Sequence, residues 1–84
     1  DPDGTLEQKD FFRVMEICLE KLPAKTARIF MMREWLELDT EEICKELGCT
    51  TSNVWVMLYR ARIRLRECLE LNWFAHQPIV RARE

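Results

Sequence analysis

The sequence predicts an all-α fold of four helices, in which a three-helix core follows one leading helix. The 84-residue chain has only two Gly and three Pro, and it is rich in Leu, Glu, Arg and Lys, which favour helices. Its apolar residues make up 48% of the chain and recur at spacings of three and four, as they do on helices. Residues 38–66 have the order of a short capped helix, a tight turn and a long helix, which predicts a helix-turn-helix without a wing.

The first half of the chain predicts two helices. Thr5 and Gln8 have the spacing of a capping box, so the leading helix is expected to begin there. We predict that its apolar stripe belongs to the core; the stripe comprises Phe12, Met15, Leu19 and Leu22, with Phe11 and Cys18 beside it. Pro23 suits the first position of a second helix, residues 23–36. Apolar residues on more than one face of this helix favour a central position in the core and leave open an exposed docking surface.

The third helix has clear start and stop signals. Asp39 can accept the first-turn amides of a helix that starts at Thr40, and Glu42 can reach back to complete a capping box. Gly48 tolerates the left-handed conformation that ends a helix. The sequence therefore predicts a short helix followed by a tight turn.

The last helix is expected to span residues 51–72, with Thr50 or Thr51 as its cap. Its predicted inward face is spaced by four, three, four and three, and comprises Val54, Leu58, Ala61, Leu65 and Cys68. Trp73 and Phe74 are expected to fold back and cover the core. We assign residues 1–4 to a linker, 5–74 to the domain and 75–84 to a tail.

The composition argues against several classes of protein. Cys18, Cys44, Cys49 and Cys68 form no C-x-x-C pair and His76 is the one histidine, so we expect reduced thiols, mostly small and buried, and neither a metal site nor a disulfide framework. Without paired acids beside a nucleophile, we expect no catalytic residues, cofactor or small-molecule substrate. No apolar run is long enough to span a bilayer, so we expect a cytoplasmic location without membrane contact.

The charge of the chain is divided between its halves. The formal net charge is −2. Residues 1–48 carry seven basic and twelve acidic residues, a net charge of −5, whereas residues 49–84 carry six basic and three acidic residues, a net charge of +3. Because the local field steers a helix toward phosphates, this division is compatible with DNA binding on one side only.

The outward face of the last helix carries the candidate binding residues. Arg60, Arg62, Arg64 and Arg66 alternate with apolar residues and divide between two helix flanks. An arginine fork can pair with guanine or with phosphate, although charged helix faces are usually only solvated. The outward face also carries large apolar and aromatic side chains where a soluble helix would carry charged ones, namely Trp55, Val56 and Tyr59. A base edge, a sugar or a protein partner should cover them.

Three motifs together resemble a known family. They are LP-x-x-x-x-x-(I/V)-F, E-E-I-x-x-x-L-G and L-x-R-A-R-x-R-L-R, and they lie without a gap between Leu22 and Leu69. This segment resembles region 4 of the sigma-70 family, specifically its extracytoplasmic-function group. The resemblance implies a bacterial sigma-factor domain that recognises the −35 element of double-stranded promoter DNA with its last helix. It also implies docking on the β flap of RNA polymerase core and inhibition by an anti-sigma factor.

Carried over by position, the resemblance assigns site residues on the last helix. It implies Trp55, Val56, Tyr59 and Arg60 as the base-facing set, and Thr51, Ser52, Asn53 and Arg62 as backbone contacts; Arg64 is added as a phosphate contact. The chain departs from the family at Trp55, Val56 and Met57, where polar or basic residues are common. It also has Glu37 where a Gly is usual, so the first junction lacks the residue that adopts a left-handed conformation without strain.

Two other functions fit parts of the sequence. A LuxR-type helix-turn-helix regulator would dimerise on paired half-sites and would not need the leading helix. A protein-interaction module would use the face around Trp55 and Tyr59 to bind a partner helix or an anti-sigma factor. The leading helix and the LP junction favour the sigma-factor domain.

Overall fold

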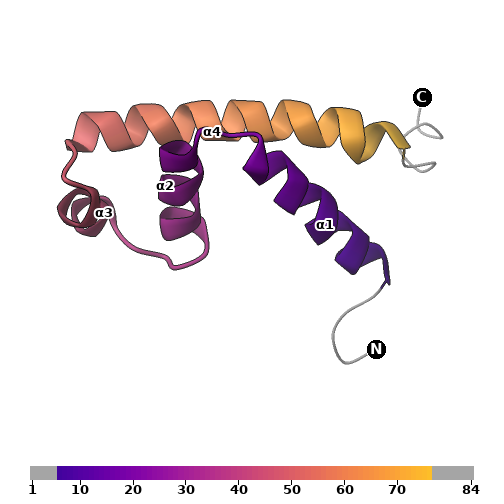
Figure 1. Ribbon diagram of the computed structural model, residues 1–84, viewed down its shortest axis with the longest axis horizontal. Coiled ribbons are helices and arrows are strands. Elements are labelled where there is room, and N and C mark those ends of the chain that lie inside the picture. Colours follow the sequence, from indigo (N-terminus) through magenta and orange to yellow (C-terminus); the bar gives the residue numbers. More distant parts are fainter. Residues whose placement is uncertain (1–5, 77–84) are drawn as a thin grey trace.

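The computed structural model describes residues 6–76, which form four α-helices and one short 3-10 helix, with no strand in this range. The elements are α1 (Leu6–Glu20), α2 (Ala24–Glu34), α3 (Thr40–Leu47), α4 (Thr51–Asn72) and η1 (Phe74–His76). Helix α4 runs the length of the molecule, α2 and α3 lie beneath its N-terminal half, and α1 diverges from its middle (Figure 1). The predicted all-α fold with a leading helix and a helix-turn-helix is confirmed. The predicted linker and all of the predicted tail except Ala75 and His76 lie outside the described residues.

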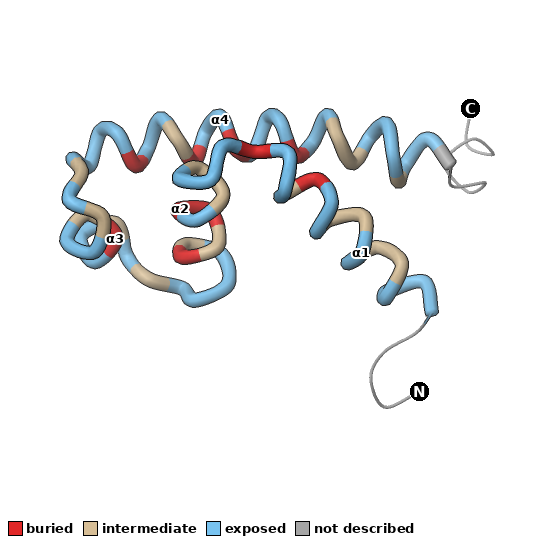
Figure 2. Tube along the Cα trace, viewed as in Figure 1, coloured by how far each residue is buried: buried red, intermediate tan, exposed pale blue. Residues whose placement is uncertain are grey.

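The core lies between α4 and the three shorter helices (Figure 2). The predicted inward face of α4 is correct, since Val54, Leu58 and Ala61 are 0% exposed and Leu65 is 3% exposed. The other buried residues come from α1, α2, α3 and the first loop: Cys18, Leu22, Ile29, Phe30, Met32 and Ile43. No polar or charged residue is buried among those described. Apolar burial on one face of each helix therefore holds the domain together.

The predicted helix-turn-helix junction is confirmed in its details. The Glu42 amide donates to Asp39 Oδ1 at 2.8 Å and the Asp39 amide donates to Glu42 Oε1 at 3.0 Å, which completes the capping box. Gly48 has φ 62° and its amide donates to the Cys44 carbonyl at 2.8 Å, so it ends α3 in the left-handed conformation. Of the two predicted caps for α4, the structure uses Thr50, whose hydroxyl accepts from the Asn53 amide at 3.1 Å.

The junction between α2 and α3 contains a backbone conformation that costs free energy. Glu37 has φ 56°, and it is the non-glycine residue with positive φ in the described range. The turn is held by the Leu38 amide, which donates to the Met32 carbonyl at 3.0 Å. The junction therefore keeps the left-handed geometry even though Glu occupies the position.

We predict that Glu37→Gly raises the free energy of unfolding by about 0.5–1 kcal/mol. Relief of about 1–2 kcal/mol of left-handed strain exceeds the entropy that Gly adds to the unfolded chain. Urea denaturation would measure the gain. The matched control is Glu67→Gly, at an exposed position inside α4, which should lower stability by about 1 kcal/mol. A loss of stability in both variants would contradict the strain at Glu37.

The predicted core stripe of the leading helix is confirmed at Leu22, which is buried, and in part at Met15 and Leu19, which pack against the core, but it is wrong at Phe12. Cys18 is the buried residue of this helix, whereas Phe12 is 55% exposed and Met15 and Leu19 are half-buried. The reason is tertiary, because α1 packs more on α4 than on α2, Cys18 is bonded to Cys68 of α4, and Phe12 lines an open groove. Trp73 packs edge-on against Phe11, with 5.4 Å between ring centroids. Trp73 thus covers α1, and Phe74 remains 42% exposed.

The prediction of reduced, mostly buried thiols was wrong for Cys18 and Cys68. These residues form a disulfide between α1 and α4, with 5.8 Å between their Cα atoms. They are 50 residues apart in the sequence, and only the packing of α1 across α4 brings them together. Cys44 and Cys49 are free and half-buried, so the predicted burial of Cys44 is only partial.

Candidate nucleic-acid interface

The nine predicted site residues lie on the part of α4 that is not buried in the core. All of them lie on α4 and all are exposed: Thr51, Ser52, Asn53, Trp55, Val56, Tyr59, Arg60, Arg62 and Arg64. The exposed fractions of Trp55, Val56 and Tyr59 are 51%, 44% and 66%. They are held outward because the opposite face of α4 is anchored in the core. The structure therefore exposes all nine predicted residues on one helix, with Arg62 and Arg64 on different flanks of it.

The first turn of α4 is suited to anions. The cap at Thr50 orients the helix start, and Thr51 and Ser52 place their amides and hydroxyls at its N-terminal end. The N-terminus of a helix carries a partial positive charge and favours phosphate or sulfate oxygens. No acidic residue occurs in this first turn. Small polar side chains and a positive helix end can therefore approach a phosphate backbone closely.

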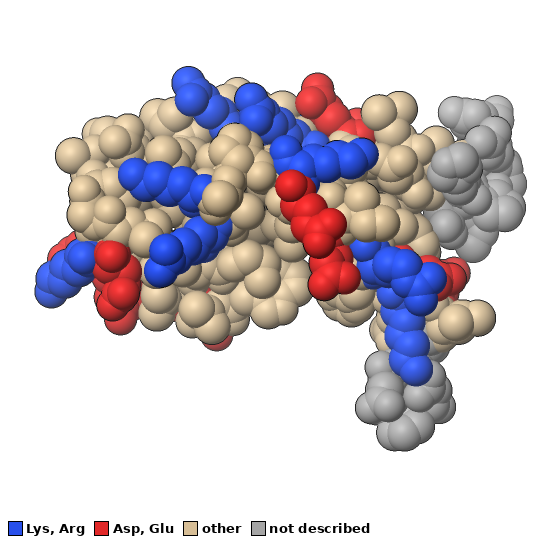
Figure 3. All heavy atoms as spheres, in the orientation of Figure 1, with Lys and Arg blue, Asp and Glu red and all other residues tan. Residues whose placement is uncertain are grey.

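The arginines of α4 differ in their surroundings. Arg62 Nη2 lies 3.3 Å from Glu34 Oε2, so Arg62 is paired with the end of α2. Within residues 6–76, Arg60 and Arg64 have no ion-pair partner. Figure 3 shows basic side chains along the edge formed by α4, with acidic side chains between them toward its C-terminal half. Arg66 is also exposed and has no ion pair in this range, so Arg60, Arg64 and Arg66 are the charges most available to an anionic partner.

An apolar groove between α1 and α2 is the feature that the sequence did not predict. It has a volume of about 460 Å³, and its lining consists of Lys9, Phe12, Arg13, Met15, Glu16, Leu19, Met31 and Trp35. Trp35 is 50% exposed just after α2. The two-sided apolar pattern of α2 was the available signal; its interpretation as a core helix is confirmed by the buried Ile29, Phe30 and Met32, and its interpretation as a docking surface stays a prediction. One side of α2 enters the core and Met31 lines the groove.

Metal sites and membrane-spanning helices were also sought in the described residues. In the range 6–76, no three His, Cys, Asp or Glu side chains converge as metal ligands. No helix in the same range is long and apolar enough to cross a membrane.

Comparison with known proteins agrees with this arrangement. The family model described as Sigma-70, region 4 matches residues 13–65. A probable RNA polymerase sigma factor of Haemophilus influenzae is 54% identical over 67 residues, which cover 80% of this chain and 34% of that protein. RNA polymerase sigma-E factors of Streptomyces avermitilis and Streptomyces coelicolor are 37% and 34% identical, over 81% and 77% of this chain and 37% and 36% of their own lengths.

The chain spans about one third of the length of these curated relatives. No solved structure gives a significant match. The family match nevertheless covers more than half of the chain, including α2, α3 and most of α1 and α4. The chain therefore belongs to the sigma-70 region 4 family, a DNA-binding domain of transcription factors without enzymatic activity.

Proposed function

We propose that this domain belongs to an extracytoplasmic-function sigma factor and reads the −35 promoter element with α4 in the cytoplasm. The observation that carries the proposal is the exposed surface of α4, which presents Trp55, Tyr59 and Arg60 while Val54, Leu58 and Ala61 of the same helix are fully buried. A helix anchored in this way can enter the major groove without disturbing the core. The sigma-E relatives support the assignment to this group.

The roles proposed on α4 follow from chemistry and position. Arg60 pairs with a base edge through its planar fork, and the bulky side chains of Trp55, Val56 and Tyr59 contact thymine methyl groups and sugars. The polar first turn and the arginine flanks contact phosphates; these residues are Thr51, Ser52, Asn53, Arg62 and Arg64. Arg62 can exchange its partner Glu34 for a phosphate, because an exposed ion pair contributes only about 0–1 kcal/mol.

The groove between α1 and α2 is the proposed docking site for the β flap of RNA polymerase. An apolar trough lined by Phe12, Leu19, Met31 and Trp35 suits the apolar face of an amphipathic helix. A second contact is needed because the first half of the chain is acidic and weakens the attraction to DNA. Joining two modest contacts raises the overall affinity through effective concentration. An anti-sigma factor would inhibit the domain by covering either surface.

We predict that Arg60→Ala weakens binding to a −35-type duplex by about 1–3 kcal/mol and relaxes sequence preference, whereas Arg64→Ala weakens binding to all duplexes alike. The measurement compares a duplex carrying an AAC element with a scrambled duplex at low and moderate salt. Arg64→Ala should also reduce the slope of affinity against salt, because one phosphate contact is lost.

An equal loss for Arg60→Ala on both duplexes would refute its base-reading role. No binding of the unaltered domain at low salt would favour the protein-interaction function of the α4 face. The match to region 4 favours the sigma-factor domain over the LuxR-type alternative.

A further inference from the structure

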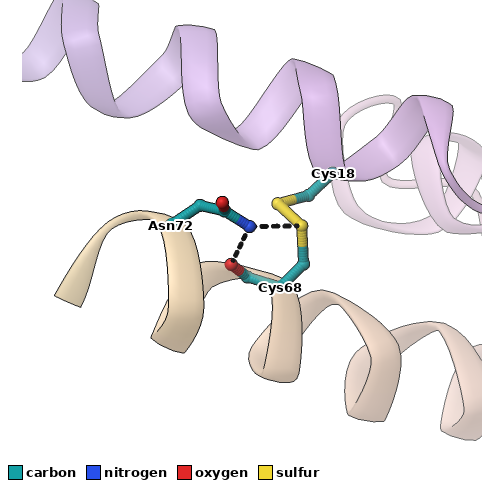
Figure 4. Close-up of a disulfide and its surroundings, with 3 residues drawn as sticks. All are labelled: Cys18, Cys68 and Asn72. Carbon is teal, nitrogen blue, oxygen red and sulfur yellow. Dashed lines mark hydrogen bonds between the residues drawn. A yellow bond between two sulfur atoms is a disulfide. The ribbon is translucent and has the colours of Figure 1, made fainter. Parts of the chain in front are cut away.

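The disulfide lies where it can control the groove. Cys18 is in α1, the helix that supplies one wall of the groove through Phe12, Met15 and Leu19. Cys68 is in α4, which belongs to the core (Figure 4). Cys18 is also the buried residue of α1. The bridge therefore ties the one buried side chain of this wall covalently to α4.

The remaining contacts of α1 are weaker. Phe11 packs edge-on against Trp73, and Val14, Met15 and Leu19 are only partly buried against the core. The α1 helix is held mainly by α4 and meets α2 at fewer points. Few buried apolar contacts mean that a segment opens at low free energy. Without the bridge, α1 would keep its helix but lose its fixed position.

We propose that Cys18 and Cys68 form a reversible thiol–disulfide site, whose oxidation fixes α1 and completes the groove. This inference rests on the proposed function of the groove as the β-flap site. The redox partner is a low-molecular-weight thiol and its disulfide, of the glutathione type. Oxidation strengthens docking on polymerase, because a preformed groove loses less conformational entropy when a partner helix binds.

The exchange balances in two steps. In reduction, a glutathione thiolate attacks Cys68 Sγ, the S–S bond breaks, and Cys18 Sγ leaves and takes a proton. A second glutathione thiolate attacks the mixed disulfide, which releases the Cys68 thiolate and oxidised glutathione. Two glutathione thiols are thus oxidised for one protein disulfide reduced. Cys68 is the site of attack because it is half-buried, whereas Cys18 is 1% exposed.

Asn72 serves as a positioning residue for Cys68. Its amide Nδ2 donates to Cys68 Sγ at 3.4 Å and to the Cys68 carbonyl at 2.8 Å (Figure 4). A hydrogen bond donated to sulfur favours the thiolate. The same side chain holds the sulfur in one place by bonding to the backbone. Asn72 should therefore shift the balance of the exchange toward the dithiol.

The DNA-reading turns of α4 lie away from this site. Arg60 precedes Cys68 by eight residues on one continuous helix, which is about 12 Å at 1.5 Å per residue. Opening of α1 should therefore alter the groove and leave the DNA surface unchanged. This separation provides an internal control.

The test uses the full chain carrying Cys44→Ser and Cys49→Ser, equilibrated in glutathione buffers of graded ratio. Alkylation and mass spectrometry measure the fraction of molecules that contain the Cys18–Cys68 disulfide. Binding to a β-flap fragment and to the −35-type duplex is measured for each form, and hydrogen exchange reports the opening of α1. We expect interconversion within the graded series, about tenfold weaker flap binding after reduction, unchanged DNA binding, and exchange that speeds up more in α1 than in the other helices. Asn72→Leu should need a more reducing buffer to reach half reduction.

Other outcomes separate this inference from the proposed function. A bond that stays intact at every ratio, or never forms, overturns the reversible site. Equal flap binding by both forms, while Trp35→Ala abolishes it, overturns the regulation and leaves the groove assignment intact. If the flap fragment binds neither form, the groove assignment fails. Hydrogen exchange then tests the remaining claim, which is that the disulfide fixes α1. Unchanged exchange in α1 on reduction refutes that claim.

Discussion

Leu58→Ala should lower the free energy of unfolding by about 2–5 kcal/mol, enough to unfold much of a small domain at moderate temperature. Leu58 is 0% exposed in the middle of α4, where Ile29 of α2 and Ile43 of α3 are also fully buried. Truncation removes the transfer free energy of the side chain and leaves a cavity that three helices line. Urea denaturation followed by circular dichroism would measure the change.

The matched control for this variant is Leu71→Ala on the same helix. Leu71 is 71% exposed, so its truncation should change stability by less than about 0.5 kcal/mol. An unchanged midpoint for Leu58→Ala would mean that the inward face of α4 is assigned wrongly. A large loss for Leu71→Ala would mean that the end of α4 is buried by contacts absent from the structure.

Loss of the Cys18–Cys68 bond should lower the free energy of unfolding by about 4 kcal/mol. The sequence separation of 50 residues closes a large loop in the unfolded chain, and the chain-entropy relation gives a value near this magnitude, about 4 kcal/mol. The measurement compares urea midpoints with and without a reductant. The double variant Cys18→Ala, Cys68→Ala should match the reduced protein and no longer respond to reductant.

The control for the bond uses the two free cysteines. Cys44→Ala, Cys49→Ala should keep the full response to reductant, because neither residue belongs to the bridge. Equal midpoints for the oxidised and reduced protein would show that the bond contributes no net stability. In that case the bond could affect the position of α1 in the folded protein, but it would not stabilise the fold by restricting the unfolded chain.

Local signals accounted for most of what the sequence could predict. The cap at Asp39, the reciprocal contact from Glu42 and the left-handed stop at Gly48 depend on residues within one or two turns of each other, and all three were predicted. The inward face of α4 was predicted because its period continues for several turns. The exposure of all nine candidate residues follows from that period alone.

The features that sequence analysis missed depend on contacts between distant segments. The burial of Cys18 in place of Phe12 depends on how α1 crosses α4, and the groove depends on the angle between α1 and α2. The pairing of Arg62 with Glu34 joins residues 28 positions apart. Periodicity identifies a buried stripe on a helix, but it does not identify the helix that will cover that stripe.

The two opposite faces of α4 have a consequence for how such a domain can evolve. The residues that stabilise the fold, Val54, Leu58 and Ala61, and the residues proposed to read DNA, Trp55, Tyr59 and Arg60, alternate along the same turns, yet the first set is buried and the second is exposed. Substitutions on the outward face therefore leave the packed interior untouched. A duplicated gene could acquire a new promoter preference one side chain at a time, with every intermediate still folded.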